Sequence, residues 1–538
     1  MIFTQKILSF SLQINNLVMN FHYNKRAKKA MIKTFLTKIT HIVTGITLTI
    51  TILLSYQSKA QREVSILKEF NEVTRKVRSL EKEKDFENAS ISFYAIDIMS
   101  GDTIVEHNAD MSLVPASVMK LVTTSAALEF LGPDFRFNTQ LQYAGNIKDN
   151  ILYGNVYIKG GGDPTFGSER FKQYYYNKLF WETFADSLKK EGIDSINGSI
   201  IGDASRFEVN STPPTWIWGD LGNYFGAAPC ALSIFENSFD IYLKSGSKNG
   251  DPTHVISTEP EIPYLELTNY VKSSNINRDL AYIFCSLYYN KRTIFGSIPK
   301  NRTKFKIKGA IPDPPYYTAL CFTKYLNEHK LGVSSKPSTI RQMNEKGQNP
   351  ETKRKTILNF YSPPLKNIIT QTNQKSINLY AEHLLNEVGR KVKNEASTVE
   401  GTKTIEKFWE EKGVNTSGFY MNDGSGLSRY NAITTRFVVE ILRYMKKESA
   451  YSNIFYNSLA VGGQTGTVKR MFKNTAAEGN IRAKSGYMNR VRSYAGYVTT
   501  VGNRKIAFAI IINNYNCTPG EVKKKMEELM ISLADLKI

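Results

Sequence analysis

Three short strings that could together carry out acyl transfer follow one another along this chain of 538 residues. They are S-V-M-K at 117–120, S-I-N at 376–378 and K-S-G at 484–486. A serine hydroxyl is a poor nucleophile at neutral pH, and a nearby lysine with a lowered pKa can serve as its base. The three strings supply a serine–lysine pair, a second polar pair and another lysine close to a glycine. This set indicates a serine acyl-transfer enzyme that uses lysine instead of histidine.

The first string opens a predicted helix, which begins at Pro115 and ends at Gly132. Ser117 and Lys120 lie three residues apart, so they share one face of this helix. The helix is apolar on nearly every side, and its burial, together with a second cation such as Lys484, would lower the pKa of Lys120. At a helix N-terminus, backbone N–H groups beside Ser117 would favour a developing oxyanion. S-x-x-K also occurs by chance, and the buried helix is what favours catalysis here.

The second string places Ser376 and Asn378 two residues apart, too close for one face of a regular helix. On a loop or at the start of a helix, both side chains could point into a cleft. Ser376 would then pass a proton between Lys120 and a leaving amine, and Asn378 would hydrogen-bond a substrate amide. The alternative is that Ser376 only caps a helix.

The third string lies on a predicted strand that pairs with the A-G-Y-V segment after it. An extended substrate could pair along such a strand, as in β-augmentation. Lys484 and Ser485 could hold a terminal carboxylate, and Gly486 would allow a close approach of the backbone. The alternative is an exposed turn at the end of a strand.

The N-terminus has the pattern of an export signal. Residues 31–60 combine a basic start with an apolar stretch from 39 to 54, and Ser58 and Ala60 are small residues before a cut after position 60. Residues 1–30 are interpreted as an upstream extension. The alternative is an uncleaved membrane anchor, and in both cases the catalytic part lies outside the cytoplasm, in the periplasm.

Charge and composition narrow the class only in part. The net charge is +21, from 70 basic and 49 acidic residues. This charge suits nucleic acid, an anionic lipid, an anionic polymer or simply a solvated lysine-rich surface, and it does not choose among them. The four cysteines are too widely spaced for a metal site, although one disulfide is compatible with export. The six histidines lack the spacing of zinc hydrolases. We therefore expect no metal site, and the oligomeric state stays open.

The order of predicted elements indicates an α/β (α+β) fold in which one antiparallel sheet lies between helices. A hairpin at 90–107 and three strands from 481 onward, with helices between them, suggest one sheet completed by both ends of the mature chain. The predicted helices lie at 62–86, 115–132, 315–329, 364–371, 376–390, 398–412, 433–447 and 520–536, and a polar linker lies at 334–355.

The domain organisation follows from a change in composition and predicted secondary structure near residue 138. Short strands and loops rich in Gly, Pro and aromatic residues begin there. We expect a leader at 1–60 and a peptidase domain from 61–137 and 360–538. A β-rich insertion occupies 138–359, in two parts, with an inner domain near 165–230.

Further segments extend the pattern beyond the three strings. They are K-G-G-G-D-P-T at 159–165, P-T-W-I-W-G-D-L-G-N-Y-F-G-A-A-P at 214–229, K-S-I-N-L-Y-A-E at 375–382, N-D-G-S-G-L-S-R at 422–429 and A-K-S-G at 483–486. With them, the chain from about residue 90 onward resembles the penicillin-recognising serine hydrolases. More narrowly, it resembles the D-alanyl-D-alanine carboxypeptidase/endopeptidase family, the class C low-molecular-weight penicillin-binding proteins (peptidase family S13). The long gap between the first two strings is typical of that family, in which two nested domains fill it.

The resemblance implies a role for each motif residue. Ser117 is the acylated nucleophile, Lys120 is its general base, and Ser376 and Asn378 form the second motif. Lys484, Ser485 and Gly486 form the third motif, whose strand contributes to the oxyanion hole and to substrate pairing. The family usually has K-T-G at this place, so Ser485 is a departure that keeps the hydroxyl and loses a methyl group.

The resemblance also implies an acidic residue of the insertion that binds the free amino end of a diamino-acid side chain. Asp203, in I-I-G-D-A-S-R-F, is the candidate by position. Asp423, in D-G-S-G, is interpreted as a structural residue of a glycine-rich turn.

The fold implied by the resemblance is the penicillin-binding transpeptidase-like fold with a two-part β-rich insertion. The implied function is that of an exported serine-type D-Ala-D-Ala carboxypeptidase, which cleaves peptidoglycan stem peptides through an acyl-enzyme on Ser117 and is acylated by β-lactam antibiotics. D,D-endopeptidase activity on cross-links stays open. The resemblance implies no organic cofactor and no nucleic-acid partner. The alternatives are a β-lactamase or esterase on the same fold, and a non-catalytic wall-binding protein.

Overall fold

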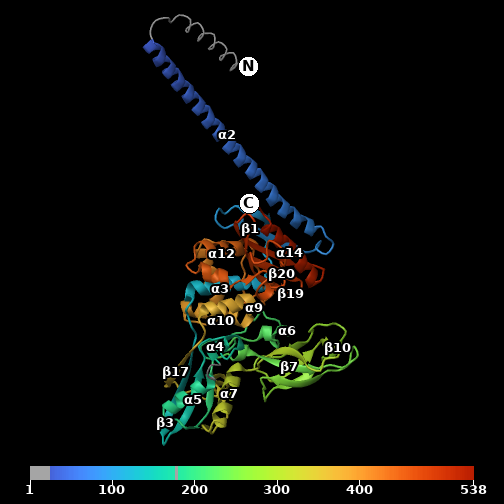
Figure 1. The fold of residues 1–538 in the computed structure, drawn as a ribbon. Helices are drawn as coiled ribbons and strands as arrows, with labels where there is room; N and C mark the ends of the chain where they lie inside the picture. Colours follow the sequence, from blue (N-terminus) through green and yellow to red (C-terminus); the bar gives the residue numbers. More distant parts are fainter. Residues whose placement is uncertain (1–24, 176–179, 538) are drawn as a thin grey trace. The chain divides into compact units, whose positions relative to one another are not determined.

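The computed structural model describes residues 25–175 and 180–537 (Figure 1). It divides into two units, Met1–Asn71 and Glu72–Ile538, and the second unit contains all three motif strings. Helix α2 (Lys25–Glu81) runs through the boundary, so the helix predicted at 62–86 is the end of a longer one. By length and composition, its first part, Lys25–Gln57, is long and apolar enough to cross a membrane. Residues 1–24 of the predicted extension lie outside the described residues.

A six-stranded antiparallel sheet forms the centre of the peptidase part, in the order β18-β19-β20-β21-β1-β2. Its strands are β1 (Ser90–Asp97), β2 (Thr103–His107), β18 (Ala460–Val461), β19 (Ile481–Met488), β20 (Val491–Thr499) and β21 (Lys505–Asn513). Ser90 of β1 pairs with Asn513 of β21, so segments from both ends of the second unit complete one sheet, as predicted. The two-residue strand β18 was not predicted.

Helices α12 (Thr435–Lys447) and α14 (Pro519–Ala534) pack against this sheet. Nearly every residue of β21 is apolar and buried, which is the pattern of a strand covered on both faces. Ala507, Ala509 and Ile511 belong to the same hydrophobic cluster as residues of α12. The alternate side chains of β21 are also fully buried, which agrees with the expectation of an antiparallel sheet between helices.

A group of helices carries the first two motif strings. It consists of α3 (Met119–Leu131), α9 (Leu365–Lys375), α10 (Asn378–Lys393) and α11 (Thr398–Glu411), with α13 (Ser452–Ser458) beside α9 and α12. Helix α10 packs against the other three, and residues 119–128 of α3 are all buried. Helix α3 ends as predicted, because the N–H of Gly132 bonds to the carbonyl of Leu128 while Gly132 has φ 76°. The other helices match their predictions to within a few residues, whereas α13 was not predicted.

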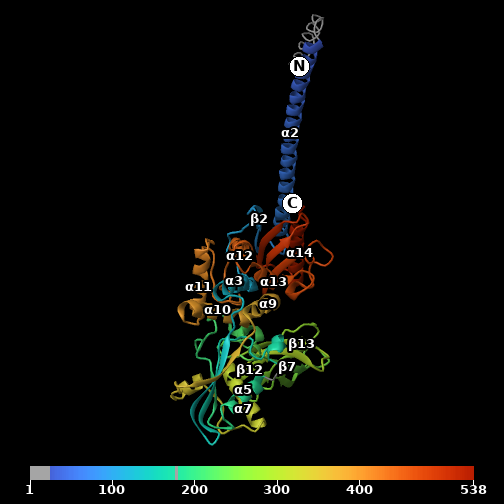
Figure 2. The same cartoon turned by 60° about the vertical axis from the view of Figure 1, so that its left-hand side comes forward.

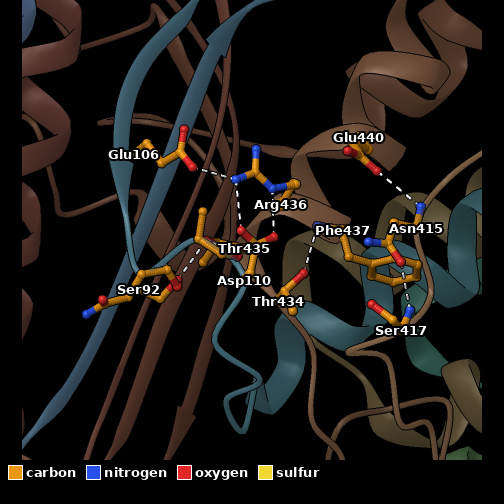
Figure 3. A network of polar contacts seen from close by, with 12 residues as sticks. Ser92, Glu106, Asp110, Asn415, Ser417, Thr434, Thr435, Arg436, Phe437 and Glu440 are labelled. Carbon is orange, nitrogen blue, oxygen red and sulfur yellow. Dashed lines mark hydrogen bonds and ion pairs between the residues drawn. The ribbon is translucent and has the colours of Figure 1, made fainter.

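A polar network ties the hairpin β1–β2 to the start of α12 (Figure 3). Arg436 donates to Glu106 at 2.6 Å and to Asp110 at 2.7 Å, while the hydroxyls of Ser92 and Thr435 lie 2.7 Å apart in the interior. Exposed ion pairs contribute little to stability, so the buried hydroxyl pair is the more important contact. The network holds the helix that covers the sheet next to its N-terminal strands.

The outer part of the insertion is built on a seven-stranded sheet with path β15-β5-β4-β3-β17, to which β6 and β16 also pair. The strands are β3 (Asn138–Lys148), β4 (Ile151–Lys159), β5 (Ser195–Asn197), β6 (Ile200–Asp203), β15 (Gly332–Val333), β16 (Ser338–Thr339) and β17 (Lys355–Tyr361). Its helices are α4 (Lys172–Tyr175), α5 (Phe180–Lys190), α7 (Pro314–Glu328) and α8 (Ile340–Glu345). The prediction of a linker at 334–355 is therefore wrong, because this segment contributes β16 and α8.

The inner part of the insertion consists of small separate sheets in 238–310, drawn in green in Figure 1. Their orders are β14-β7-β8, β11-β12-β9 and β10-β13. The strands are β7 (Ser238–Lys244), β8 (His254–Glu259), β9 (Glu266–Asn269), β10 (Lys272–Ser274), β11 (Tyr282–Phe284), β12 (Lys291–Phe295), β13 (Ser297–Pro299) and β14 (Phe305–Ala310). Short helical turns connect the parts: η2 (Glu169–Phe171), α6 (Trp218–Leu221), η3 (Tyr224–Gly226) and η4 (Phe235–Asn237).

The range 165–230, expected to form the inner domain, instead supplies β5 and β6 to the outer sheet. Its prolines and most of its glycines lie in loops and short turns, which resemble a separate small domain in sequence alone, whereas Phe180, Trp181 and Phe184 lie on helix α5. We therefore propose that the inner domain is formed by 238–310, and that it is nested in an outer domain within 138–361. The four cysteines, Cys230, Cys285, Cys321 and Cys517, are all free.

Candidate active site

A cleft of about 750 Å³ brings residues of the first two motif strings together with the insertion. Ser117, Ser376 and Asn378 line it from the peptidase helices. Asp220 of α6 and Tyr282 of β11 line it from the insertion. The long insertion therefore forms a wall of the same cleft into which the candidate nucleophile opens.

A sharp turn precedes the candidate nucleophile. Ser117 lies in the short turn η1 (Ala116–Val118), which leads directly into α3, and it is half-buried. Ala116 has φ 46°, in the left-handed region, which costs a residue with a side chain on the order of 1–3 kcal/mol. The hydroxyl of Ser493 on β20 donates to the carbonyl of Pro115 at 2.6 Å and helps to hold the turn. This strained turn places Ser117 at the N-terminal end of a buried helix.

Lys120 lies below Ser117, and its side chain is fully buried. Its Nζ donates to Ser117 Oγ at 2.8 Å, to Asn378 Oδ1 at 2.6 Å and to the carbonyl of Ser425 at 2.7 Å. These three directions match the three N–H bonds of an ammonium group. If the amine loses one proton, the other two acceptors still orient it, and its lone pair faces the hydroxyl of Ser117.

Burial lowers the pKa of Lys120 to about 7, while the carboxylates of Asp423 and Glu382 act in the opposite direction. A substantial fraction of the amine is therefore neutral near pH 7, as a general base requires. The sequence predicts this effect of burial. The predicted effect of a second cation is found at Lys484 and not at Lys120. Burial, and then the charge of Lys120, lower the pKa of Lys484 well below its usual value.

The second string occupies a break between two helices. Ser376 ends α9 with φ 60° and ψ 41°, and Asn378 begins α10. Ser376 is therefore not an N-cap. The left-handed turn allows residues two apart to line the same cleft. Asn378 accepts a hydrogen bond from Lys120, and its Nδ2 donates to the carbonyl of Phe225 in the insertion at 2.7 Å.

The third string lies on β19 and pairs in antiparallel register with β20. Lys484 is fully buried, and its Nζ donates to Ser376 Oγ at 2.8 Å and to the carbonyl of Ser485 at 2.6 Å. The sequence predicts that Ser376 faces Lys120. The hydrogen bonds instead join Ser376 to Lys484, and Asn378 to Lys120. The hydroxyl of Ser485 donates to Thr467 Oγ1 at 2.7 Å.

Gly486 lies where β19 meets the nucleophile turn. A Cβ atom at this position would lie 2.2 Å from Ser493 Oγ, 2.7 Å from the carbonyl oxygen of Pro115 and 3.0 Å from the backbone nitrogen of Ser117. Two of these atoms are backbone, so they cannot move aside as a flexible side chain would. Glycine thus permits the contact that places the N–H of Ser117 beside β19, where an oxyanion could be stabilised.

Asp423 organises the loop that faces Lys120. It is fully buried and accepts hydrogen bonds from the backbone N–H groups of Gly426 and Ser428 at 2.7 and 2.6 Å. It also accepts from the side chains of Asn431 and Trp216 at 2.8 and 2.7 Å. Asp423 therefore holds a tight turn, in agreement with the structural interpretation from the sequence.

Glu382 is a site residue that the sequence reasoning missed. Its carboxylate accepts hydrogen bonds from the backbone N–H groups of Gly424 at 2.9 Å and Ser425 at 2.8 Å. It thereby aims the carbonyl of Ser425 at Lys120. Burial and the nearby Asp423 raise the pKa of Glu382 to about 8. A signal was present, because Glu382 follows Asn378 by four residues and shares its helix face.

Asp203 does not reach the cleft. It lies buried at the end of β6, where its Oδ2 accepts a hydrogen bond from Arg354 at 2.6 Å. Two carboxylates of the insertion line the cleft, Asp220 and Glu236. Asp220 has Arg429 nearby, whereas Glu236 forms an ion pair with Arg170 at 2.9 Å. Burial raises the pKa of Asp220, and Arg429 acts against this effect. The position of Asp203 does not fit the predicted role, whereas Asp220, which lies in the W-G-D segment already singled out, is at the cleft.

Comparisons with known proteins agree with this geometry. The model of the D-Ala-D-Ala carboxypeptidase 3 (S13) family matches residues 73–536. D-alanyl-D-alanine carboxypeptidase DacB of Haemophilus influenzae is 26% identical over 82% of this chain and 89% of that protein. D-alanyl-D-alanine carboxypeptidase of Actinomadura sp. strain R39 is 25% identical over 80% of this chain and 79% of that protein.

A solved structure shows the same fold. Penicillin binding protein 4 (dacB) of Haemophilus influenzae matches with a TM-score of 0.72 at 22% identity, over 87% of this chain and 99% of that one. The α+β architecture with its long insertion is therefore that of a penicillin-binding protein. From its sequence and its fold together, the chain belongs to the D-Ala-D-Ala carboxypeptidase 3 (S13) family.

Proposed function

We propose that this chain is an exported serine-type D-Ala-D-Ala carboxypeptidase, which cleaves peptidoglycan stem peptides through an acyl-enzyme on Ser117. The observation that carries the proposal is the 2.8 Å contact between Lys120 Nζ and Ser117 Oγ at the bottom of the cleft. A buried lysine with a pKa of about 7 is suited to accept the serine proton.

Catalysis would proceed in two halves. Neutral Lys120 accepts the proton of Ser117 while Oγ attacks the carbonyl carbon between the two D-alanines, and the carbonyl oxygen becomes an oxyanion beside the N–H of Ser117. The C–N bond then breaks as the proton held by Lys120 passes through Ser376 to the leaving amine of D-alanine. A water molecule next attacks the ester carbonyl and gives a proton to Lys120, the ester C–O bond breaks, the peptide leaves with a new carboxyl group, and Lys120 returns this proton to Ser117 Oγ.

The exposed edge of β19 supports binding of an extended peptide. Strand β18 pairs with Arg482 and Ala483, whereas Tyr487 and Met488 further along β19 line the cleft. A stem peptide could add along this edge, with its terminal carboxylate toward Lys484 and Ser485. The same edge would hold a β-lactam, whose acyl-enzyme on Ser117 would hydrolyse slowly.

The wall that the insertion adds to the cleft supports D,D-endopeptidase activity on cross-linked peptides as a second activity of the same site. It also argues against a β-lactamase, which needs room only for a small drug. The apolar N-terminal span of α2 and the family together support export to the periplasm, with the leader acting as a signal or as an anchor.

Labelling with a fluorescent penicillin tests the proposed nucleophile. We expect the label on the peptide that contains Ser117, and we expect Ser117→Ala to lose both the label and D-alanine release while it stays folded. Mass spectrometry of the digested protein locates the label. A label on another serine, or D-alanine release by Ser117→Ala, would contradict the proposal, and rapid turnover of the adduct would favour a β-lactamase.

The pH dependence of acylation tests Lys120 as the base. Because burial lowers the pKa of Lys120 to about 7, the base form is populated above this pH and lost below it. The acylation rate with a chromogenic β-lactam should therefore rise with pH and level off above about pH 8. Lys120→Arg should acylate at least about 100-fold more slowly, since arginine keeps its proton. A rate that keeps rising tenfold per pH unit to pH 10 would be inconsistent with this base.

Asp220 and Asp203 form a matched pair for testing side-chain recognition. We propose that Asp220 binds the free amine of the diamino acid in the stem peptide. Asp220→Asn should lower kcat/KM about tenfold for a peptide with this amine free, relative to the same peptide with the amine acetylated. Asp203→Asn should leave this ratio unchanged, because Asp203 is paired with Arg354. The proposal fails if Asp203→Asn changes the ratio and Asp220→Asn does not.

A further inference from the structure

A row of aromatic side chains lies on the outer face of the inner insertion domain. Tyr270 and Phe295 stack with ring centroids 5.2 Å apart and planes 10° apart. Phe295 lies 5.7 Å from Phe284, which lies 4.7 Å from Trp218 of α6. We call these four residues, together with Tyr282, the aromatic platform.

The strand register explains why these rings share one face. Tyr282 of β11 is paired directly with Phe295 of β12, and Phe284 follows Tyr282 by two residues, so all three side chains point to the same side. The alternate residues, Ile283 and Ile294, are fully buried in the core. The small sheet thus covers its inner face with aliphatic residues and presents aromatic rings outward.

The platform is exposed to an unusual degree. Trp218 is 62% exposed, Tyr270 56%, Tyr282 49% and Phe295 44%. Single exposed aromatic residues are common, whereas a contiguous group of them marks a binding surface. Tyr282, Phe284 and Phe295 are carried on paired strands and Trp218 on a helical turn. Tyr270 follows β9 and donates its N–H to the carbonyl of Ile294 at 2.9 Å, so little conformational freedom would be lost on binding.

The platform is continuous with the active-site cleft. Tyr282 lines the cleft together with Ser117, and so do Ile217 and Gly219, which flank Trp218. The row leads from there along β11 and β12 to Tyr270. A ligand on the platform would therefore belong to the same molecule whose peptide reaches Ser117.

We propose that the aromatic platform binds the glycan strand of peptidoglycan, so that the stem peptide attached to that strand enters the cleft. This inference rests on the proposed function, which supplies the substrate. The C–H faces of hexosamine rings are apolar and flat enough to stack on aromatic rings, while their polar edges stay in water. The five platform side chains are uncharged, which suits the neutral sugar backbone better than a polyanion, whose binding needs cations.

The test uses strands of β-1,4-linked N-acetylglucosamine, a neutral form of the glycan backbone without stem peptides, as the probe, and binding is measured by isothermal titration calorimetry. The variant Tyr270→Ala/Phe295→Ala removes the stacked pair farthest along the row from Ser117. We expect its affinity for the strands to fall at least about tenfold, whereas hydrolysis of a short D-Ala-D-Ala peptide without sugar stays within about twofold of the wild type. Activity on intact peptidoglycan should fall with the affinity.

Two further variants control for folding and for exposure. Tyr153→Ala removes an aromatic side chain that is also 49% exposed but lies on β4 of the outer sheet, and it should bind the strands as the wild type does. Tyr270→Leu/Phe295→Leu keeps apolar side chains without flat rings and should lose the affinity too. Penicillin labelling of Ser117 establishes that each variant is folded.

The outcomes separate this inference from the proposed function. Equal affinity of the wild type and Tyr270→Ala/Phe295→Ala, or no binding by the wild type, would overturn the platform while short-peptide hydrolysis still supports the carboxypeptidase. Glycan binding without peptide hydrolysis would support the platform and contradict the proposed carboxypeptidase activity. Self-association of the wild type that the double variant loses, with no glycan binding, would identify the platform as an interface between copies of the chain and also overturn the inference.

Discussion

Removing the ammonium group of Lys120 from water is the constraint on which the rest of the site depends. A lysine in water keeps its proton at neutral pH and cannot serve as a base, so the chain must bury it without leaving its N–H groups unpaired. The carbonyl of Ser425 and the side chains of Ser117 and Asn378 meet this requirement with three hydrogen bonds of 2.6–2.8 Å. The acceptors come from three segments far apart in the sequence, so the base is in place only when the peptidase domain is folded.

The surrounding structure supports these acceptors. Glu382 and Asp423 fix the loop that carries the carbonyl of Ser425, and both are themselves buried and hydrogen-bonded to backbone N–H groups. The negative charge of Asp423 counteracts part of the effect of burial on Lys120, whose pKa is lowered to about 7. The insertion adds the carbonyl of Phe225, which orients the amide of Asn378. The insertion therefore belongs to the catalytic geometry as well as to the wall of the cleft.

Features with a local cause could be predicted from the sequence. Apolar periodicity and turn residues predict the buried helix that follows Ser117 and the strand that contains Lys484. They also predict the sheet that strands from both ends of the peptidase domain form together. Features that depend on distant partners could not. Asp203 is paired with Arg354, 151 positions away, and no pattern around either residue reveals this. The pairing of Ser376 with Lys484 depends on a left-handed turn at a serine. The small sheets within 238–310 consist of short strands, and their sequences do not reveal which strands pair.

The ionisation state of Lys120 in the folded protein tests the account most directly. NMR of protein labelled with ¹³C at lysine Cε reports each amine separately, and the Lys120 signal is assigned as the one that Lys120→Arg lacks. The account predicts a titration midpoint near pH 7 for this signal, well apart from those of the surface lysines. A midpoint near pH 10 would mean that Lys120 stays protonated under working conditions, and it would contradict the role of this lysine as the base for Ser117.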